Sequence, residues 1–128
     1  MKRITREWVE KAEDNWFAAR QLHRARKHPQ RNLVCFLSQQ CVELYLKARL
    51  KEAGIKFHKT HDLPYLLRLA SKVEPAWRVF QPQANALNDY AVDSRYPGKS
   101  ATKAEAKQAL KDCGAIQAVR AALGLPPD

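Results

Sequence analysis

One long stretch of the sequence, residues 32–54, constrains the fold more than any other. Twelve of the eighteen residues from Leu33 to Leu50 are apolar, and neither Pro nor Gly interrupts them. Apolar residues on most of a helix circumference indicate a helix surrounded by other helices. Three charged residues keep the uncharged run too short for a membrane span. Because Gly54 can end a helix in the left-handed conformation, the stretch predicts the central helix of a soluble bundle.

A polar stripe runs along this apolar helix. At about 100° per residue, Phe36, Gln40, Glu43 and Lys47 fall on one face. Polar groups beside an apolar seam need partners or water. The simpler interpretation is a Glu43–Lys47 pair at the half-exposed edge of the bundle, worth about a few tenths of a kcal/mol. The alternative is one wall of a polar cleft, and the spacing favours the pair.

Composition and charge limit the class of protein. The chain of 128 residues is expected to form a single domain, residues 1–128, with a real core. Its charged N-terminal segment has no apolar signal region, so we expect a cytoplasmic protein. Three cysteines without metal-type spacing indicate reduced, buried thiols rather than a zinc site. The net charge of +10 favours polyanions or an acidic protein as partners, without choosing among nucleic acid, nucleotide and protein.

Apolar spacing predicts helices on both sides of the central one. Thr5 is expected to cap a first helix that runs to about Arg26. Asp62 or Thr60 is expected to cap a third helix, with Pro64 in its first turn. A basic run closes the first helix, where it either complements the helix dipole, the favoured interpretation, or contacts phosphate. This run comprises Arg20, His23, Arg24, Arg26, Lys27 and His28.

Two more helices complete the pattern. The fourth has an apolar seam from Trp77 to Ala91, and Pro82 either kinks it or marks its true start. Thr102 and Glu105 form a capping box for the fifth. The sequence has no alternating strand pattern. It therefore predicts an all-α protein, an up-and-down bundle of about five helices, four long and one short.

The predicted topology brings distant polar residues together. Short connections make sequential helices antiparallel, so the end of the central helix and the start of the third would share one end of the bundle. The end of the fourth and the start of the fifth would join them, with the basic run at the opposite end. The converging residues are Lys47, His58, His61, Asp62, Asp89, Asp93, Arg95 and Tyr96.

These residues favour ligand binding over metal chemistry. His58 and His61 lack the further ligands of a metal site, so no metal is expected. Asp93 and Arg95 are interpreted chiefly as organisers of the following turn. Arg95 can also pair with a phosphate, and Tyr96 offers a flat face for a base.

Three separated motifs resemble the HEPN domain family, a nucleotide-binding family of higher eukaryotes and prokaryotes. The resemblance covers nearly the whole chain, although Leu44 stands where the family pattern often has Lys. The matching stretches are FLSQQCVELYLKARLKEAGIKFHKTHDLPYLL and DSRYPG. The matching residues are Asp14, Gln40, Glu43, Lys47, Thr60, His61, Asp62, Leu63, Arg95, Tyr96 and Pro97.

The resemblance implies a helical bundle that commonly forms homodimers. Many stand-alone members act beside a small nucleotidyltransferase in toxin–antitoxin-like pairs. No cofactor and no membrane association are expected. Many members are metal-independent ribonucleases whose signature is an Arg followed by a His on the same helix, with four to six residues between them. That signature is absent from this sequence, so ribonuclease activity would need a non-standard pair, His61 with Arg95.

The leading hypothesis is a nucleotide- or RNA-binding module without established catalysis. Lys47, His61, Arg95 and Tyr96 would hold phosphate and base beside Asp62, while Gln40, Glu43 and Asp93 would orient them. The alternatives are a ribonuclease toxin that uses the non-standard pair and a module that only binds other proteins.

Overall fold

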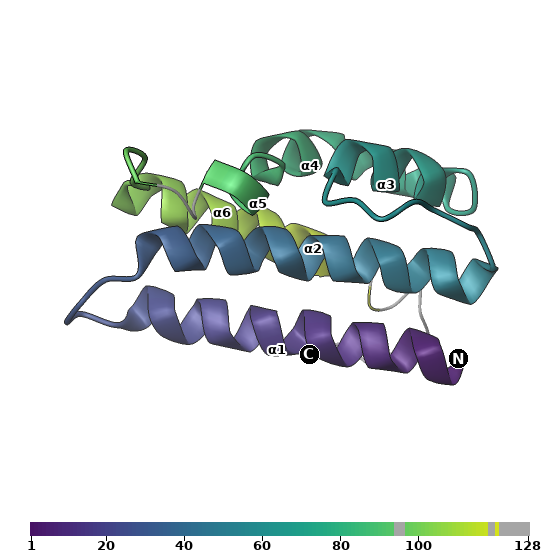
Figure 1. Cartoon of the computed structure of the whole chain (residues 1–128), viewed down its shortest axis with the longest axis horizontal. Helices are drawn as coiled ribbons and strands as arrows, with labels where there is room; N and C mark the ends of the chain where they lie inside the picture. The colour runs from purple at the N-terminus through teal and green to yellow at the C-terminus, as the bar shows by residue number, and fades with distance from the viewer. Residues whose placement is uncertain (94–96, 118–119, 121–128) are drawn as a thin grey trace.

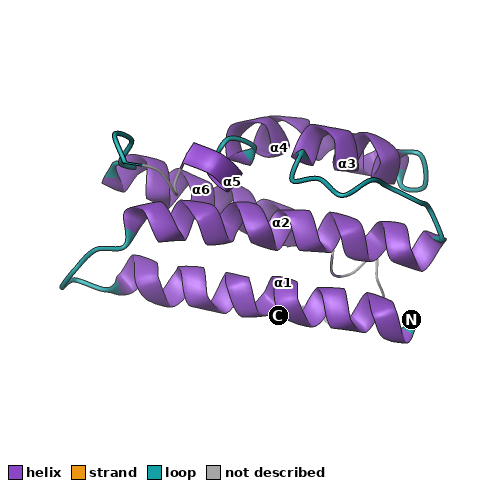
Figure 2. Ribbon diagram, viewed as in Figure 1, coloured by secondary structure: helices purple, strands orange, loops and turns teal. Residues whose placement is uncertain are grey.

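The protein is an all-α bundle, which confirms the predicted fold class. The computed structural model describes residues 1–93, 97–117 and 120, and within these ranges it contains no strand. Figures 1 and 2 show the helices stacked in layers, with the α1–α2 pair on one side and the short helices on the other. The elements are α1 (Arg3–Arg24), α2 (Arg31–Ala53), α3 (Leu63–Ser71), the 3₁₀ helix η1 (Pro75–Phe80), α4 (Gln81–Leu87), α5 (Tyr90–Asp93) and α6 (Lys103–Gln117).

The helices α1 and α2 form a long antiparallel pair (Figure 1). The start of α1 meets the end of α2, where Thr5 Oγ1 donates to Glu52 Oε1 at 2.8 Å. The Lys2 backbone N–H and the Thr5 hydroxyl lower the pKa of the Glu52 carboxyl. Because Thr5 is buried inside α1 and Lys2 occupies the N-cap, the prediction of a Thr5 cap is wrong. The hydroxyl ties two helices together instead of satisfying the backbone of its own.

The central position of α2 is confirmed. It packs against α1, α3, α4, α5 and α6. Gly54 ends it at φ 71°, the left-handed conformation that the sequence predicts. The apolar residues of α2 that are at most 1% exposed come from most of its circumference: Val34, Cys35, Cys41, Val42, Tyr45, Leu46, Ala48 and Leu50.

The segment after α2 turns back along that helix instead of continuing past its end. Gln39 Nε2 donates to the His61 carbonyl at 3.2 Å, so the start of α3 lies beside the middle of α2. Residues 54–62 have no helix or strand. At about 3.3 Å per residue they reach about 30 Å, more than the roughly 22 Å that α2 rises from residue 39 to residue 54. Arg49 pairs with Glu74 at 3.1 Å, so α3 runs in the same direction as α2. The antiparallel order predicted for these two helices is therefore wrong.

The predicted fourth helix is divided into η1, α4 and α5. Pro82 is the second residue of α4, where a missing N–H costs no helical hydrogen bond. It therefore marks a helix start, one of the two predicted outcomes. Asn88 Oδ1, just after α4, accepts the Leu63 backbone N–H at 2.9 Å and joins the end of α4 to the start of α3.

The last helix begins at the end of the bundle opposite to the predicted one. The capping box is confirmed, since the Thr102 and Glu105 side chains each accept the other's backbone N–H at 3.1 Å. The Ala101 N–H donates to Asn32 Oδ1 at 2.6 Å, which places the start of α6 beside the start of α2. The shared end predicted for the polar residues is therefore wrong. The start of α6 lies with the basic run.

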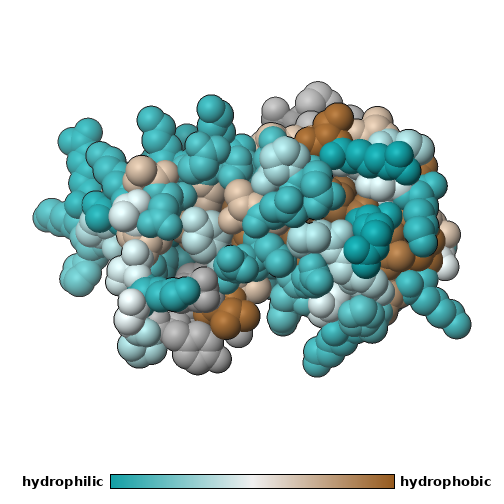
Figure 3. Space-filling model, turned by 90° about the horizontal axis from the view of Figure 1, so that it is seen from above, coloured by the Kyte–Doolittle hydropathy of each residue, from teal (hydrophilic) through white to brown (hydrophobic). Residues whose placement is uncertain are grey.

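The face of the bundle that is seen from above in Figure 3 is largely hydrophilic. Figure 3 shows hydrophobic atoms only in separate areas of the face seen from above. Val79, 69% exposed, and Val92, 56% exposed, are the most exposed large apolar residues described. Within the described ranges, no helix combines the length and the apolar character that crossing a membrane requires.

Candidate functional site

Glu43 is the centre of a polar cluster on the middle of α2. Its side chain is 3% exposed. A buried carboxylate is costly unless charged or polar donors surround it, and four donors do so here. They are Lys47 Nζ at 3.0 Å, His61 Nδ1 at 2.8 Å, Gln39 Nε2 at 3.3 Å and Gln40 Nε2 at 3.4 Å.

Lys47 is buried together with Glu43. Its side chain is 8% exposed, and Nζ lies 5.7 Å from the Trp8 ring centroid and 5.9 Å from that of Phe57. Aromatic faces at these distances stabilise a cation. The predicted pair is thus present, but its predicted half-exposed position is wrong. Trp8 of α1 and Phe57 of the returning segment 54–62 lie beside the ammonium group.

His61 brings the cluster to the surface. Its side chain is 55% exposed although Nδ1 contacts Glu43 Oε1. A carboxylate only accepts hydrogen bonds, so Nδ1 carries the proton, and Nε2 is the acceptor of the neutral ring. A carboxylate that orients a histidine in this way is the arrangement used to position a proton-transfer base. The imidazole can therefore bind a ligand donor or accept a proton.

Gln39 belongs to the cluster, although the sequence analysis did not single it out. Its side chain is fully buried and bonds both Glu43 and the His61 carbonyl. Gln40, half-buried, donates to Gln39 Oε1 at 2.8 Å. The spacing of Gln39 from Glu43, one helical turn, was the available signal. Its amide fixes the backbone of the segment that carries His61.

Asp62 has a structural role at the start of α3. Its Oδ1 accepts the Tyr65 N–H at 3.1 Å, and Thr60 Oγ1 accepts the Asp62 N–H at 3.1 Å. Both predicted capping residues therefore participate. The His58 ring packs on Tyr65 with centroids 4.2 Å apart and does not join the Glu43 cluster.

The three other predicted site residues are Asp93, Arg95 and Tyr96. Asp93 ends α5, but its side chain is outside the described part of the chain, as are Arg95 and Tyr96. Among the described residues, no group of His, Cys, Asp and Glu is arranged to hold a metal ion.

A second, partly buried polar group joins Glu13 of α1, Tyr45 of α2 and Arg120, which follows α6. Tyr45 Oη donates to Glu13 Oε2 at 3.1 Å, and the Arg120 guanidinium also bonds Glu13. Burial raises the pKa of the Tyr45 hydroxyl, and burial beside Cys113 raises the pKa of the Cys41 thiol well above its ordinary value. The Tyr45 hydroxyl and the Cys41 thiol therefore stay protonated and serve the core.

Comparison with known proteins gives one clear match. A model of the HEPN domain matches residues 5–121, which include every helix from α2 to α6 and nearly all of α1. No curated protein and no solved structure shows a significant match to the chain.

Proposed function

Because the chain belongs to the HEPN domain family, we propose that it is a nucleotide- or RNA-binding module whose ligand meets the bundle at His61. Membership of the family supports a nucleotide- or RNA-related function in general. The observation that carries the more specific proposal is the Glu43 cluster, which holds an exposed imidazole in one orientation from beneath.

The burial of charge in this cluster supports a positioning role. A buried ion pair is a weak source of stability, because desolvation offsets the attraction between the charges. An apolar pair of similar volume would fill the same space without that cost. Glu43 instead contacts His61 at the surface, and Lys47 pairs with Glu43 from the buried side. The half-buried Gln40 also donates to Glu43. Because Lys47 is buried and paired with Glu43, we exchange the roles expected for Lys47 and Gln40. Ligand contact is assigned to His61 and Gln40, and orientation to Glu43 and Lys47.

The residues around the turn after α5 complete the proposed site. Arg95 would bind phosphate and Tyr96 would stack on a base, with Asp93 and Asp62 ordering the neighbouring backbone. These roles come from the family resemblance and from the chemistry of the side chains.

The proposed assembly is a homodimer that acts with a small nucleotidyltransferase in a toxin–antitoxin-like pair. The family resemblance supports both partners, and the net charge of +10 suits an acidic protein surface. Native mass spectrometry of the protein purified from its own cells tests this assembly. A dimer carrying a second chain or a nucleotide is expected, and a bare monomer would refute it.

The ligand site is tested with alanine variants of two proposed site residues and of a neighbouring control histidine. His61→Ala and Arg95→Ala are expected to weaken binding of labelled ATP or of a labelled RNA oligonucleotide at least tenfold in fluorescence anisotropy. His58→Ala is the control, since His58 lies three residues away and contacts Tyr65 rather than Glu43. Equal losses for His61→Ala and His58→Ala, or no loss for either, would remove His61 from the site.

The contact between His61 and Glu43 also favours a second candidate function, metal-independent RNA cleavage. A carboxylate 2.8 Å from Nδ1 orients the ring so that Nε2 can take a proton from an attacking 2′-hydroxyl. The 2′-oxygen would bond to phosphorus as the P–O5′ bond breaks, and the leaving 5′-oxygen would take a proton from water. Arg95 would stabilise the negative charge on the phosphate. Cleavage of RNA in the presence of a chelator, lost in His61→Ala and absent with DNA of the same sequence, is the expected result. Intact RNA after incubation with the wild-type protein would refute this candidate.

A further inference from the structure

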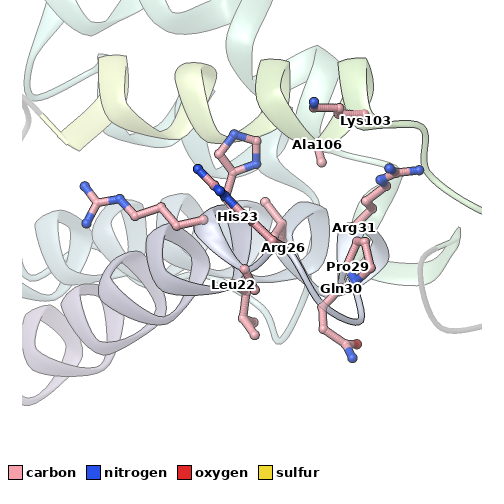
Figure 4. A pocket seen from close by; sticks show the side chains of 11 residues that line it. Leu22, His23, Arg26, Pro29, Gln30, Arg31, Lys103 and Ala106 are labelled. Atoms are coloured by element: carbon pink, nitrogen blue, oxygen red, sulfur yellow. The ribbon is translucent and has the colours of Figure 1, made fainter.

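A pocket of about 320 Å³ opens at the end of the bundle where α1, α2 and α6 meet. It lies between the last turn of α1, residues 25–30, and the first turns of α2 and α6. Figure 4 shows the side chains of His23, Arg26, Arg31 and Lys103 around it. Val34 and Ala106 are its buried apolar residues. The eleven lining residues include Arg24 and no Asp or Glu.

The cations of this pocket have no ion-pair partner among the residues that the structure describes. They are Arg24, Arg26, Arg31 and Lys103. The contrast is Arg49, which pairs with Glu74 at 3.1 Å. Like charges gathered at one site repel each other unless a bound anion neutralises them.

The start of α2 adds to the positive potential. Its N-cap residue, Gln30, makes no side-chain capping bond, and its first turn contains no acidic residue. The first N–H groups of a helix have no partner within the helix and attract anions. The C-terminus of α1 has the opposite partial charge, but His23 and Arg24 occupy its last turn.

The lining of the pocket favours phosphate over a base as its occupant. It contains no Phe, Tyr or Trp on which a base could stack, and its only ring of that kind is the His23 imidazole. The charged side chains at its rim, Arg24, Arg26, Arg31 and Lys103, are exposed. Lys27 and His28 extend the basic surface beyond it. A continuous surface of this kind suits a polymer with repeated phosphates better than a single small anion.

We propose that this basic pocket binds the phosphate backbone of a single-stranded nucleic acid, independently of base sequence. It is a second contact region, separate from the His61 surface, and it rests on the proposed function only in taking a nucleic acid as the ligand. The middle of α2 at Glu43 lies about 18 Å along the helix from Arg31, so one strand can follow both regions.

The test is the salt dependence of binding. Each phosphate neutralised on a single strand contributes a slope of about −0.7 to the logarithm of affinity against the logarithm of salt concentration. The double variant Arg26→Gln/Arg31→Gln is therefore expected to flatten the slope by about 1.4 and to weaken binding about 25-fold at roughly 0.1 M salt. A labelled RNA oligonucleotide and DNA of the same sequence should lose affinity equally, because backbone contacts do not read the 2′-hydroxyl. RNA-only loss would overturn backbone binding.

The control is Arg6→Gln/Lys11→Gln, which removes the same charge from exposed positions nearer the other end of α1. An equal change of slope in this control would overturn the pocket and leave a general charge effect. Unchanged binding in the pocket variant, with loss in His61→Ala, would overturn the pocket and leave the proposed function standing. Loss in the pocket variant alone would support the pocket and remove His61 from the site. A wild-type protein that binds neither strand would overturn both.

Discussion

The buried pair of Glu43 and Lys47 gives the sharpest prediction about how the fold supports its site. The two charges are 3.0 Å apart, and their side chains are 3% and 8% exposed. Glu43→Gln keeps the shape of the side chain but removes its charge, so the Lys47 ammonium stays buried without a counter-ion. Removing one partner of a buried pair costs about 3–5 kcal/mol. At roughly 4 °C per kcal/mol for a domain of this size, the melting temperature should fall by about 12–20 °C.

The double variant Glu43→Gln/Lys47→Met distinguishes stability lost because one buried charge is unpaired from stability lost through general damage to the core. It leaves no charge in the buried site, so part of the lost stability should return. We expect a coupling free energy of about 2 kcal/mol from the double-mutant cycle, measured by urea unfolding followed with circular dichroism.

The chain contains a matched control for this cycle. Arg3 and Glu7 have the same four-residue spacing on α1, but their side chains are 95% and 54% exposed and 3.7 Å apart. Exposed pairs of this kind couple by about 0.5 kcal/mol or less. If the Glu43–Lys47 cycle gave the same small value, the pair would be solvated, and the reasoning from its burial would be refuted.

Three further predictions concern single groups. Gly54→Ala should cost about 1 kcal/mol in thermal unfolding, because φ 71° strains an L residue although the nearest atom to a new Cβ, Lys2 Nζ, is 4.0 Å away; an unchanged melting temperature would contradict this. Thr102→Ala should cost about 1 kcal/mol through loss of the cap on α6, and Thr102→Ser should restore most of it. Burial raises the pKa of the Cys35 thiol from 9.0 to about 11, so the unfolded chain loses this proton first. Stability from this group should therefore be complete below pH 9 and fall as pH rises towards about 11, and Cys35→Ala should reduce that fall in urea titrations.

Local signals in the sequence predicted the helices and their ends. Gly54, Asp62 and the box of Thr102 and Glu105 occupy the predicted caps, because capping depends on residues within one turn. The Thr5 cap was wrong because that hydroxyl bonds Glu52, a residue far along the chain. Local propensity does not include such a partner.

The sequence by itself determined that Gln40, Glu43 and Lys47 share one face of a central helix, because the helical repeat fixes their angles. The tertiary structure decided that this face is buried and that His61 completes it. It did so through the path of residues 54–62, which turn back along α2 until Gln39 bonds the His61 carbonyl. It also placed the start of α6 beside the basic run through the bond between Ala101 and Asn32. Both outcomes depend on contacts between segments distant in the chain, whereas the periodicity of a helix specifies only which of its own residues lie together.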